Sequence, residues 1–172
     1  VFNYNSLRLT ITGYYNSVTD MIRWLPGSDG VWRPVNEDEV QIYGLESGLN
    51  WSKTFKNKHR FSLNATYAYT ISENEETGYQ LIYVPFHKVT AGMNYNYKRL
   101  HTNLQFLYVG AVFTRSDNNS RYNLDAYTVG NFSLGYRLGK SEQFELGGRI
   151  NNFLDAEYQS VENRWMPGRN YT

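Results

Sequence analysis

The stretch of sequence that decides the fold is 147–172, GGRINNFLDAEYQSVENRWMPGRNYT. Apolar or small residues alternate with polar ones over 144–150, which is the two-residue period of a β-strand with one buried face. The alternation stops at 151–152, and a short polar and aromatic segment follows. Residues 167–169 (PGR) then begin a second extended run. The stretch therefore predicts a strand, an ordered loop and a returning strand.

The same alternation recurs along the rest of the chain. Together with the terminal hairpin it predicts about eight strands, the eighth represented only by its start. One face of each strand is nearly free of charge, whereas the other is rich in Asn, Ser, Thr and Gly. No segment keeps a period of 3.6 residues over three turns, so no substantial helix is expected. The strands expected upstream of the terminal hairpin are 7–16, 42–55, 60–72, 88–97, 102–108 and 131–138.

The connections between these strands alternate between long and short. The short turns are basic and the long polar loops carry most of the acidic groups. Transmembrane β-barrels place short turns on the periplasmic side and long loops on the extracellular side, whereas a soluble sandwich has no reason to do so. The long loops are 17–41, 73–86, 114–126 and 153–166; their acidic groups include Asp29, Glu37, Asp38, Glu39, Glu73, Glu75 and Glu76.

The fold class predicted by this pattern is all-β: an antiparallel transmembrane β-barrel segment with long extracellular loops and short periplasmic turns, in contact with outer-membrane lipid. Tyrosine and tryptophan gather toward the strand ends, as in the aromatic girdles of such barrels. Aromatic residues make up 17% of the chain, more than an ordinary soluble core needs. A soluble β-sandwich, with the uncharged faces forming a dry core, is the alternative that this composition leaves open.

Composition also excludes several classes of protein. The chain has no cysteine, so neither a disulfide framework nor a thiolate metal site can form. Its net charge of +1 gives no bulk attraction to nucleic acid, and no nucleic-acid partner is expected. The longest largely apolar run, 106–113, is far shorter than the ~20 residues that a membrane helix needs.

Several motifs resemble the C-terminal part of the β-barrel of TonB-dependent outer-membrane receptors. The terminal hairpin carries the most specific of them, an NFLD motif at 152–155, then Tyr158 and the PGR motif. Similar motifs lie at 44–48 (GLESG), 84–88 (VPFHK) and 127–135. Family members carry an N-terminal plug domain and a barrel of about 22 strands. Nothing in the chain resembles a plug, so the resemblance implies that residues 1–172 form a C-terminal portion of such a barrel.

The resemblance implies a binding and transport function in the outer membrane of a Gram-negative bacterium. A receptor of this family captures a scarce extracellular ligand, such as a siderophore, cobalamin or another nutrient. An inner-membrane energy-coupling complex then drives uptake by acting on the plug domain. The alternative is a small eight-stranded outer-membrane barrel that acts as an adhesin or structural protein.

Candidate ligand contacts are the tryptophans of the long loops, Trp24, Trp32 and Trp165. Rigid aromatic side chains beside hydrogen-bond acceptors are suited to a ligand vestibule. Packing within the loops, or contact with lipid headgroups, is the alternative role for these side chains.

No enzymatic activity, cofactor or metal site is predicted. The three histidines are scattered without the spacing of a zinc site, and no acid/base or nucleophile set converges at one strand end. The run 116–120 (SDNNS) carries oxygen donors but lacks the spacing of an EF-hand loop, so a solvated loop is the better interpretation. Glu46 and Arg149 are both expected to face the lumen, where they could pair with each other or face the plug domain of a complete receptor.

Overall fold

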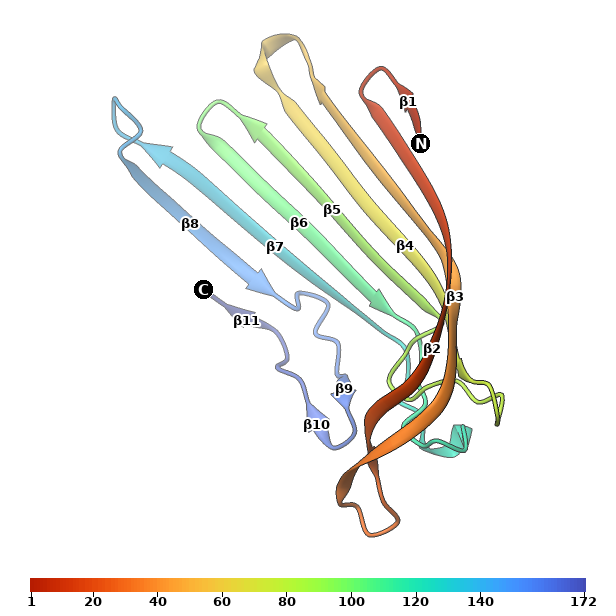
Figure 1. Cartoon of the computed structure of the whole chain (residues 1–172). Coiled ribbons are helices and arrows are strands. Elements are labelled where there is room, and N and C mark those ends of the chain that lie inside the picture. Colours follow the sequence, from red (N-terminus) through yellow and green to blue (C-terminus); the bar gives the residue numbers. More distant parts are fainter.

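The computed structural model describes the backbone of residues 1–172 and all side chains except those of Glu37 and Asp38. The part of the predicted acidic pattern that rests on these two side chains lies outside the described residues. Nine strands in chain order form one antiparallel sheet in the part of the chain that is described (Figure 1). They are β1 (Phe2–Tyr4), β2 (Leu7–Pro26), β3 (Trp32–Thr54), β4 (Arg60–Asn74), β5 (His87–Tyr97), β6 (Leu100–Val109), β7 (Tyr127–Leu138), β8 (Phe144–Asn151) and β11 (Asn170–Tyr171).

The sheet is a single curved layer, and the predicted all-β antiparallel fold is confirmed. Figure 1 shows the long connections gathered at one end of the sheet, here called the loop end, and the short turns at the other, the turn end. Within the described part of the chain the sheet is open, because β1 lies at one edge and β11 at the other and neither pairs with a further strand. A separate small hairpin, β9 (Gln159–Val161) and β10 (Arg164–Trp165), lies within the last connection.

Helical structure is minimal, as expected. The described residues include two single-turn 3₁₀ helices, η1 (Lys56–Lys58) in the β3–β4 turn and η2 (Ser120–Tyr122) in the β6–β7 connection. Among the described residues, no helix has the length and apolar character needed to cross a membrane.

The prediction of a long loop at 17–41 is wrong. β2 and β3 continue as a hairpin through this segment, with the same register on both sides of Asp20 down to the pair Pro26–Trp32. A short turn closes the hairpin, where the amide of Gly30 donates to the carbonyl of Gly27 at 2.9 Å. Outside a membrane both faces of a hairpin are exposed to water, so apolar and polar residues need not alternate along its strands, although the strands still pair through their backbones. The polar composition of 17–41 therefore reflects a solvent-exposed hairpin rather than an irregular loop.

The register arranges side chains of like chemistry in rows across the strands. On one face, here called the apolar face, a row joins Leu7, Trp51, Leu63, Met93, Leu104, Phe132 and Ile150. On the opposite, polar face the adjacent row joins Arg8, Asn50, Asn64, Gly92, Gln105 and Asn131. This division matches a membrane barrel with an apolar lipid-facing band and a polar lumen.

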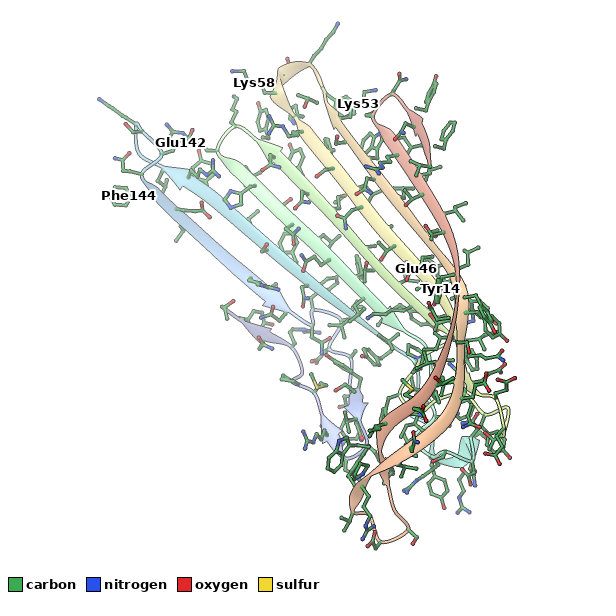
Figure 2. All side chains as sticks on the ribbon, in the orientation of Figure 1. Tyr14, Glu46, Lys53, Lys58, Glu142 and Phe144 are labelled. Carbon is green, nitrogen blue, oxygen red and sulfur yellow. The ribbon has the colours of Figure 1, made fainter. Side chains whose placement is uncertain are left out.

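Glu46 and Arg149 both lie on the polar face, as expected, but they are too far apart to pair. Glu46 lies on β3 and Arg149 on β8, and four strands separate them. Neighbouring strands are ~4.8 Å apart, so the two backbones are ~24 Å apart along the sheet, beyond the reach of their side chains. Glu46 instead lies near Tyr14, midway along the sheet (Figure 2).

The terminal hairpin is fastened by two side chains of the NFLD motif. Asn152, only 3% exposed, accepts a hydrogen bond from the Ala156 amide at 3.0 Å and donates to the carbonyls of Ala156 at 2.9 Å and Pro167 at 3.3 Å. Asp155 accepts from the backbone amide of Arg169 at 2.9 Å, and its other oxygen lies 3.9 Å from the Arg169 guanidinium. The motif therefore attaches the PGR turn to the end of β8.

Candidate functional site

The loop end has a small core of its own, built from the connections 75–86 and 110–126. Leu81, Ile82 and Val112 are buried there at 5, 6 and 8% exposure. Val40 and Val129 are also buried, although each occupies a polar-face position of the sheet. The two connections therefore fold over the polar face rather than extend freely into solvent.

Amide side chains join the two connections. The backbone amide of Gln80 donates to Oδ1 of Asn118 at 2.7 Å, and Nδ2 of Asn118 donates back to the Gln80 carbonyl at 2.8 Å. Oε1 of Gln80 accepts from the amide of Ser72 at the end of β4, at 2.9 Å. Because one residue holds both the neighbouring connection and the sheet, the two connections are fixed relative to the barrel wall.

Tyr83 joins four segments that are distant in sequence. Its amide donates to the carbonyl of Phe113 at 2.9 Å, and its ring stacks on Trp32 of β3 with the centroids 6.3 Å apart. Its hydroxyl accepts from the backbone amide of Glu162, in the β9–β10 turn, at 3.4 Å. The residue holds a φ of +62°, a left-handed conformation that costs a bulky side chain energy and is typical of functional or tightly constrained positions.

Arg115 adds a second link between the connections. Its guanidinium lies 3.4 Å from the carboxylate of Glu162 and 5.2 Å from the centroid of the Tyr122 ring. Nε of Arg115 is buried and has no hydrogen-bond partner within the described residues. The ion pair is about one-third exposed on both sides, so its contribution is positional more than energetic.

A cavity of about 210 Å³ lies on the polar face beneath these connections. Among the described residues, its wall combines aromatic, aliphatic and amide-bearing residues with a lysine, Lys88, and an acidic residue, Asp125. Next to it, Tyr127 and Tyr158 stack with ring centroids 4.2 Å apart, which rigidifies one side. The lining includes Tyr83, Lys88, Val109, Leu124, Tyr127 and Gln159. Concave sites of mainly apolar lining with a few polar groups are where small ligands bind.

The three predicted tryptophans are at the loop end, but the structure does not gather them into one cluster. Trp24 and Trp32 occupy the same face of the β2–β3 hairpin, with 63 and 42% of their surface exposed. Trp165 lies on β10, 68% exposed and without a ring partner among the described residues. Trp32 approaches the cavity through Tyr83, whereas the described lining of the cavity contains none of the three.

The cavity residues were not singled out by the sequence. For Lys88, which belongs to the VPFHK motif, a signal was available: the alternation along its strand places the residue on the polar face. No comparable signal marked Tyr83 or Tyr127 in the sequence, because the role of each depends on a distant ring partner. Trp32 is 51 residues from Tyr83, and Tyr158 is 31 residues from Tyr127.

The run 116–120 forms local turns. Asp117 accepts from the amide of Asn119, Asn119 accepts from the amide of Arg121, and Asn118 is engaged by Gln80. Within the described residues, no three His, Asp or Glu side chains converge as a metal site.

Comparison with known proteins identifies the fold. Residues 1–153 match the family model of the TonB dependent receptor-like β-barrel. The vitamin B12 transporter BtuB of Photobacterium profundum is 25% identical over 94% of the chain, and that of Vibrio vulnificus is 29% identical over 90%. The chain covers 26 and 24% of these relatives, about a quarter of their length.

Solved structures agree on the architecture. The copper transporter OprC superimposes on 99% of the chain with a TM-score of 0.75 at 18% identity, the chain covering 28% of it. The siderophore receptor PiuA from Acinetobacter baumannii covers 99% with a TM-score of 0.74 at 21% identity, the chain covering 26% of it. The chain belongs to the TonB-dependent receptor family, as part of the β-barrel of an outer-membrane protein of a Gram-negative bacterium.

Proposed function

We propose that the chain forms one sector of the barrel wall, and of the extracellular ligand site, of a receptor that imports a scarce nutrient. The observation that carries this proposal is the cavity on the polar face, enclosed by connections that Tyr83 ties together. A site that faces the lumen beneath extracellular loops can pass its ligand inward, whereas an adhesion surface has no need of one. Ferric siderophores and cobalamin are the ligand classes that we propose, because the relatives and structural neighbours include a vitamin B12 transporter and siderophore receptors.

The open sheet supports assigning residues 1–172 to a portion of a larger barrel. Its edge strands β1 and β11 offer unpaired backbone groups, which a membrane barrel must satisfy by closure. We therefore propose that further strands complete the wall, and that a plug domain outside this chain couples ligand release to an inner-membrane energy-coupling complex. A closed eight-stranded adhesin does not fit the open sheet. No catalytic role is proposed, since the family comprises receptors and transporters.

Within the site we assign Lys88 to an acidic group of the ligand, because it is the basic residue among the described residues that line the cavity. Trp32 supports the ring of Tyr83 at the rim of the cavity. We propose that Trp24 and Trp165 contact the ligand before it reaches the cavity. Both side chains are exposed, Trp24 near the tip of the β2–β3 hairpin and Trp165 on the neighbouring β9–β10 hairpin.

The test has two stages. Deletion of the full-length gene should abolish uptake of one labelled ligand from a panel of cyanocobalamin and ferric siderophores, and plasmid-borne wild type should restore it. Binding of that ligand to the purified full-length protein is then measured for Lys88→Gln, with Arg149→Gln as the matched control. Arg149 is a polar-face cation on β8 and lies outside the described lining of the cavity.

We expect Lys88→Gln to weaken binding at least tenfold, since one charge-assisted hydrogen bond contributes about 1.5–3 kcal/mol, and Arg149→Gln to leave it unchanged. Equal weakening by both substitutions would point to the overall charge of the lumen rather than to this cavity. Unchanged uptake of every ligand after deletion, with no binding in vitro, would refute the receptor function itself.

A further inference from the structure

The turn end of the apolar face carries a rigid aromatic surface, here called the aromatic shelf and made of Phe55, His59, Phe61, Tyr95 and Tyr97. The rings of His59 and Tyr97 stack face to face, with centroids 4.0 Å apart and planes 5° apart. Nδ1 of His59 lies 2.9 Å from the hydroxyl of Tyr95, whose ring is 4.6 Å from that of Phe61. Phe55 meets Phe61 edge to face at 5.8 Å.

A lysine stands at each end of the aromatic shelf. The ammonium of Lys53 lies 5.2 Å from the ring centroid of Phe55, and that of Lys98 lies 5.0 Å from the ring centroid of Tyr97. Figure 2 shows Lys53 and Lys58 at the turn end of the sheet. Among the described side chains neither Lys53 nor Lys98 forms an ion pair, so their charges are uncompensated. Cation–π contact holds each ammonium beside a ring while its N–H donors remain available.

Toward the loop end the same face carries carboxylates, whereas its arginines, Arg23 and Arg33, lie farther out on the β2–β3 hairpin and Arg33 pairs with Asp29. Of these carboxylates, Glu73 accepts a hydrogen bond from the Tyr43 hydroxyl at 3.3 Å, and both belong to apolar-face positions of the register. Glu39 lies beside Glu75 on that face, and the pKa of Glu39 is raised because the two carboxyl groups share a hydrogen bond and repel as anions. An anionic headgroup is therefore repelled beside these carboxylates and attracted by the lysines at the turn end.

From this asymmetry we propose that the aromatic shelf with Lys53 and Lys98 is a binding site for an anionic phospholipid of the periplasmic leaflet. Each ammonium group takes a headgroup phosphate beside its own ring, and the rings between the two lysines take the glycerol and upper acyl region, where aromatic side chains prefer to lie. A zwitterionic lipid fits less well, because its own ammonium compensates the phosphate charge. The inference is independent of the ligand that the loops bind.

The experiment uses the full-length protein in nanodiscs made from equal amounts of phosphatidylglycerol and phosphatidylethanolamine. Native mass spectrometry counts the lipids of each kind that stay bound on release. Lys53→Gln and Lys98→Gln are compared, singly and together, with Lys140→Gln in the β7–β8 turn, which removes the same charge at the turn end away from the aromatic shelf. Because all three side chains are exposed, folding should be intact, as checked by heat-modifiable migration in gels.

We expect wild type to retain phosphatidylglycerol preferentially, with the preference falling roughly fivefold per shelf lysine and about 30-fold for the double variant, while Lys140→Gln has no effect. Tyr97→Leu should also reduce the preference although both lysines remain, because the ring that holds Lys98 is gone. Equal losses from all three lysine variants would overturn the proposal in favour of diffuse attraction to basic turns. Displacement of the lipid by millimolar inorganic phosphate would overturn it in favour of a site for free phosphate.

Discussion

Replacing Asn152 by alanine tests whether the NFLD motif acts as the fastener of the terminal hairpin. The substitution removes three hydrogen bonds at a residue that is 3% exposed, and it leaves the amide of Ala156 and the carbonyls of Ala156 and Pro167 without their partner. Each neutral hydrogen bond contributes about 1 kcal/mol net, and buried unpaired groups raise the loss. The φ of +48° adds about 1 kcal/mol against alanine, because asparagine tolerates the left-handed region better. The expected total is about 4 kcal/mol.

Hydrogen–deuterium exchange of the full-length protein measures this loss locally. A cost of about 4 kcal/mol corresponds to roughly a 10³-fold faster exchange in peptides that cover 153–158 and 168–172, if these amides exchange by local opening. Asn152→Gly separates the two causes, because glycine adopts a positive φ freely and keeps only the hydrogen-bond loss of about 3 kcal/mol.

Asn151→Ala is the matched control for this experiment. Asn151 is adjacent in sequence and also bonds the last strand, through Nδ2 to Asn170 at 2.8 Å, but that bond is exposed. Its loss should cost about 0.5–1 kcal/mol, or less than a tenfold change in exchange. If Asn151→Ala and Asn152→Ala accelerate exchange equally, the buried hydrogen bonds of Asn152 are not what holds the hairpin and the reasoning is refuted.

Two further predictions concern the sheet and its longest hairpin. Gly44→Ala should lower the heat-denaturation midpoint of the full-length protein, because the new methyl group would collide with the carbonyl of Tyr69 and destabilise the fold by about 2 kcal/mol or more. Gly48→Ala is the control and should destabilise the protein less, because its methyl group meets only the movable Thr10 hydroxyl. Equal effects of the two substitutions would contradict this reasoning. The pKa of Asp29 is lowered from 3.8 to about 2 by the Arg33 guanidinium, so the ion pair favours the closed hairpin above pH 3.8 and is lost as the pH falls through about 2. Pepsin prefers aromatic and leucine sites, so after normalisation to a peptide substrate it should cut wild type beside Leu25 or Trp32 several-fold faster near pH 2 than at pH 4. Asp29→Asn should be cut equally at both, and equal cleavage of wild type at both pH values would count against the prediction.

Most of the barrel wall could be predicted from the sequence because each strand has one face in contact with lipid. That contact forces an apolar residue at every second position, and the period is visible wherever the strand crosses the membrane. The seven long strands, β2 to β8, were located in this way, whereas the start of the last strand, β11, was expected from the PGR motif. The short β1 was missed, since three residues are too few to show a period, and the extension of β2 and β3 was missed because it lies where both faces are wet.

The candidate site was less predictable than the wall. Trp32 was selected from its residue type and its place in a polar segment, but its partner Tyr83 lies 51 residues away and is defined by a positive φ that no local pattern indicates. The amide pair of Gln80 and Asn118 is likewise formed between two connections. Contacts of this kind depend on where the wall places the ends of its strands, so they become visible only once the register is known.

The way the loop end is assembled bears on how a ligand site can change in this fold. In the barrel wall one side chain can be substituted with little effect on the others, because each contacts mainly lipid or the lumen. At the loop end, by contrast, Tyr83 serves four segments at once, and Glu162 contacts both Tyr83 and Arg115. A substitution in one connection therefore alters the support of the others, and the contribution of any one loop to binding should be strongly non-additive with its neighbours. Ligand specificity in such a site is a property of the connected set of loops, whereas membrane placement is a property of the individual strands.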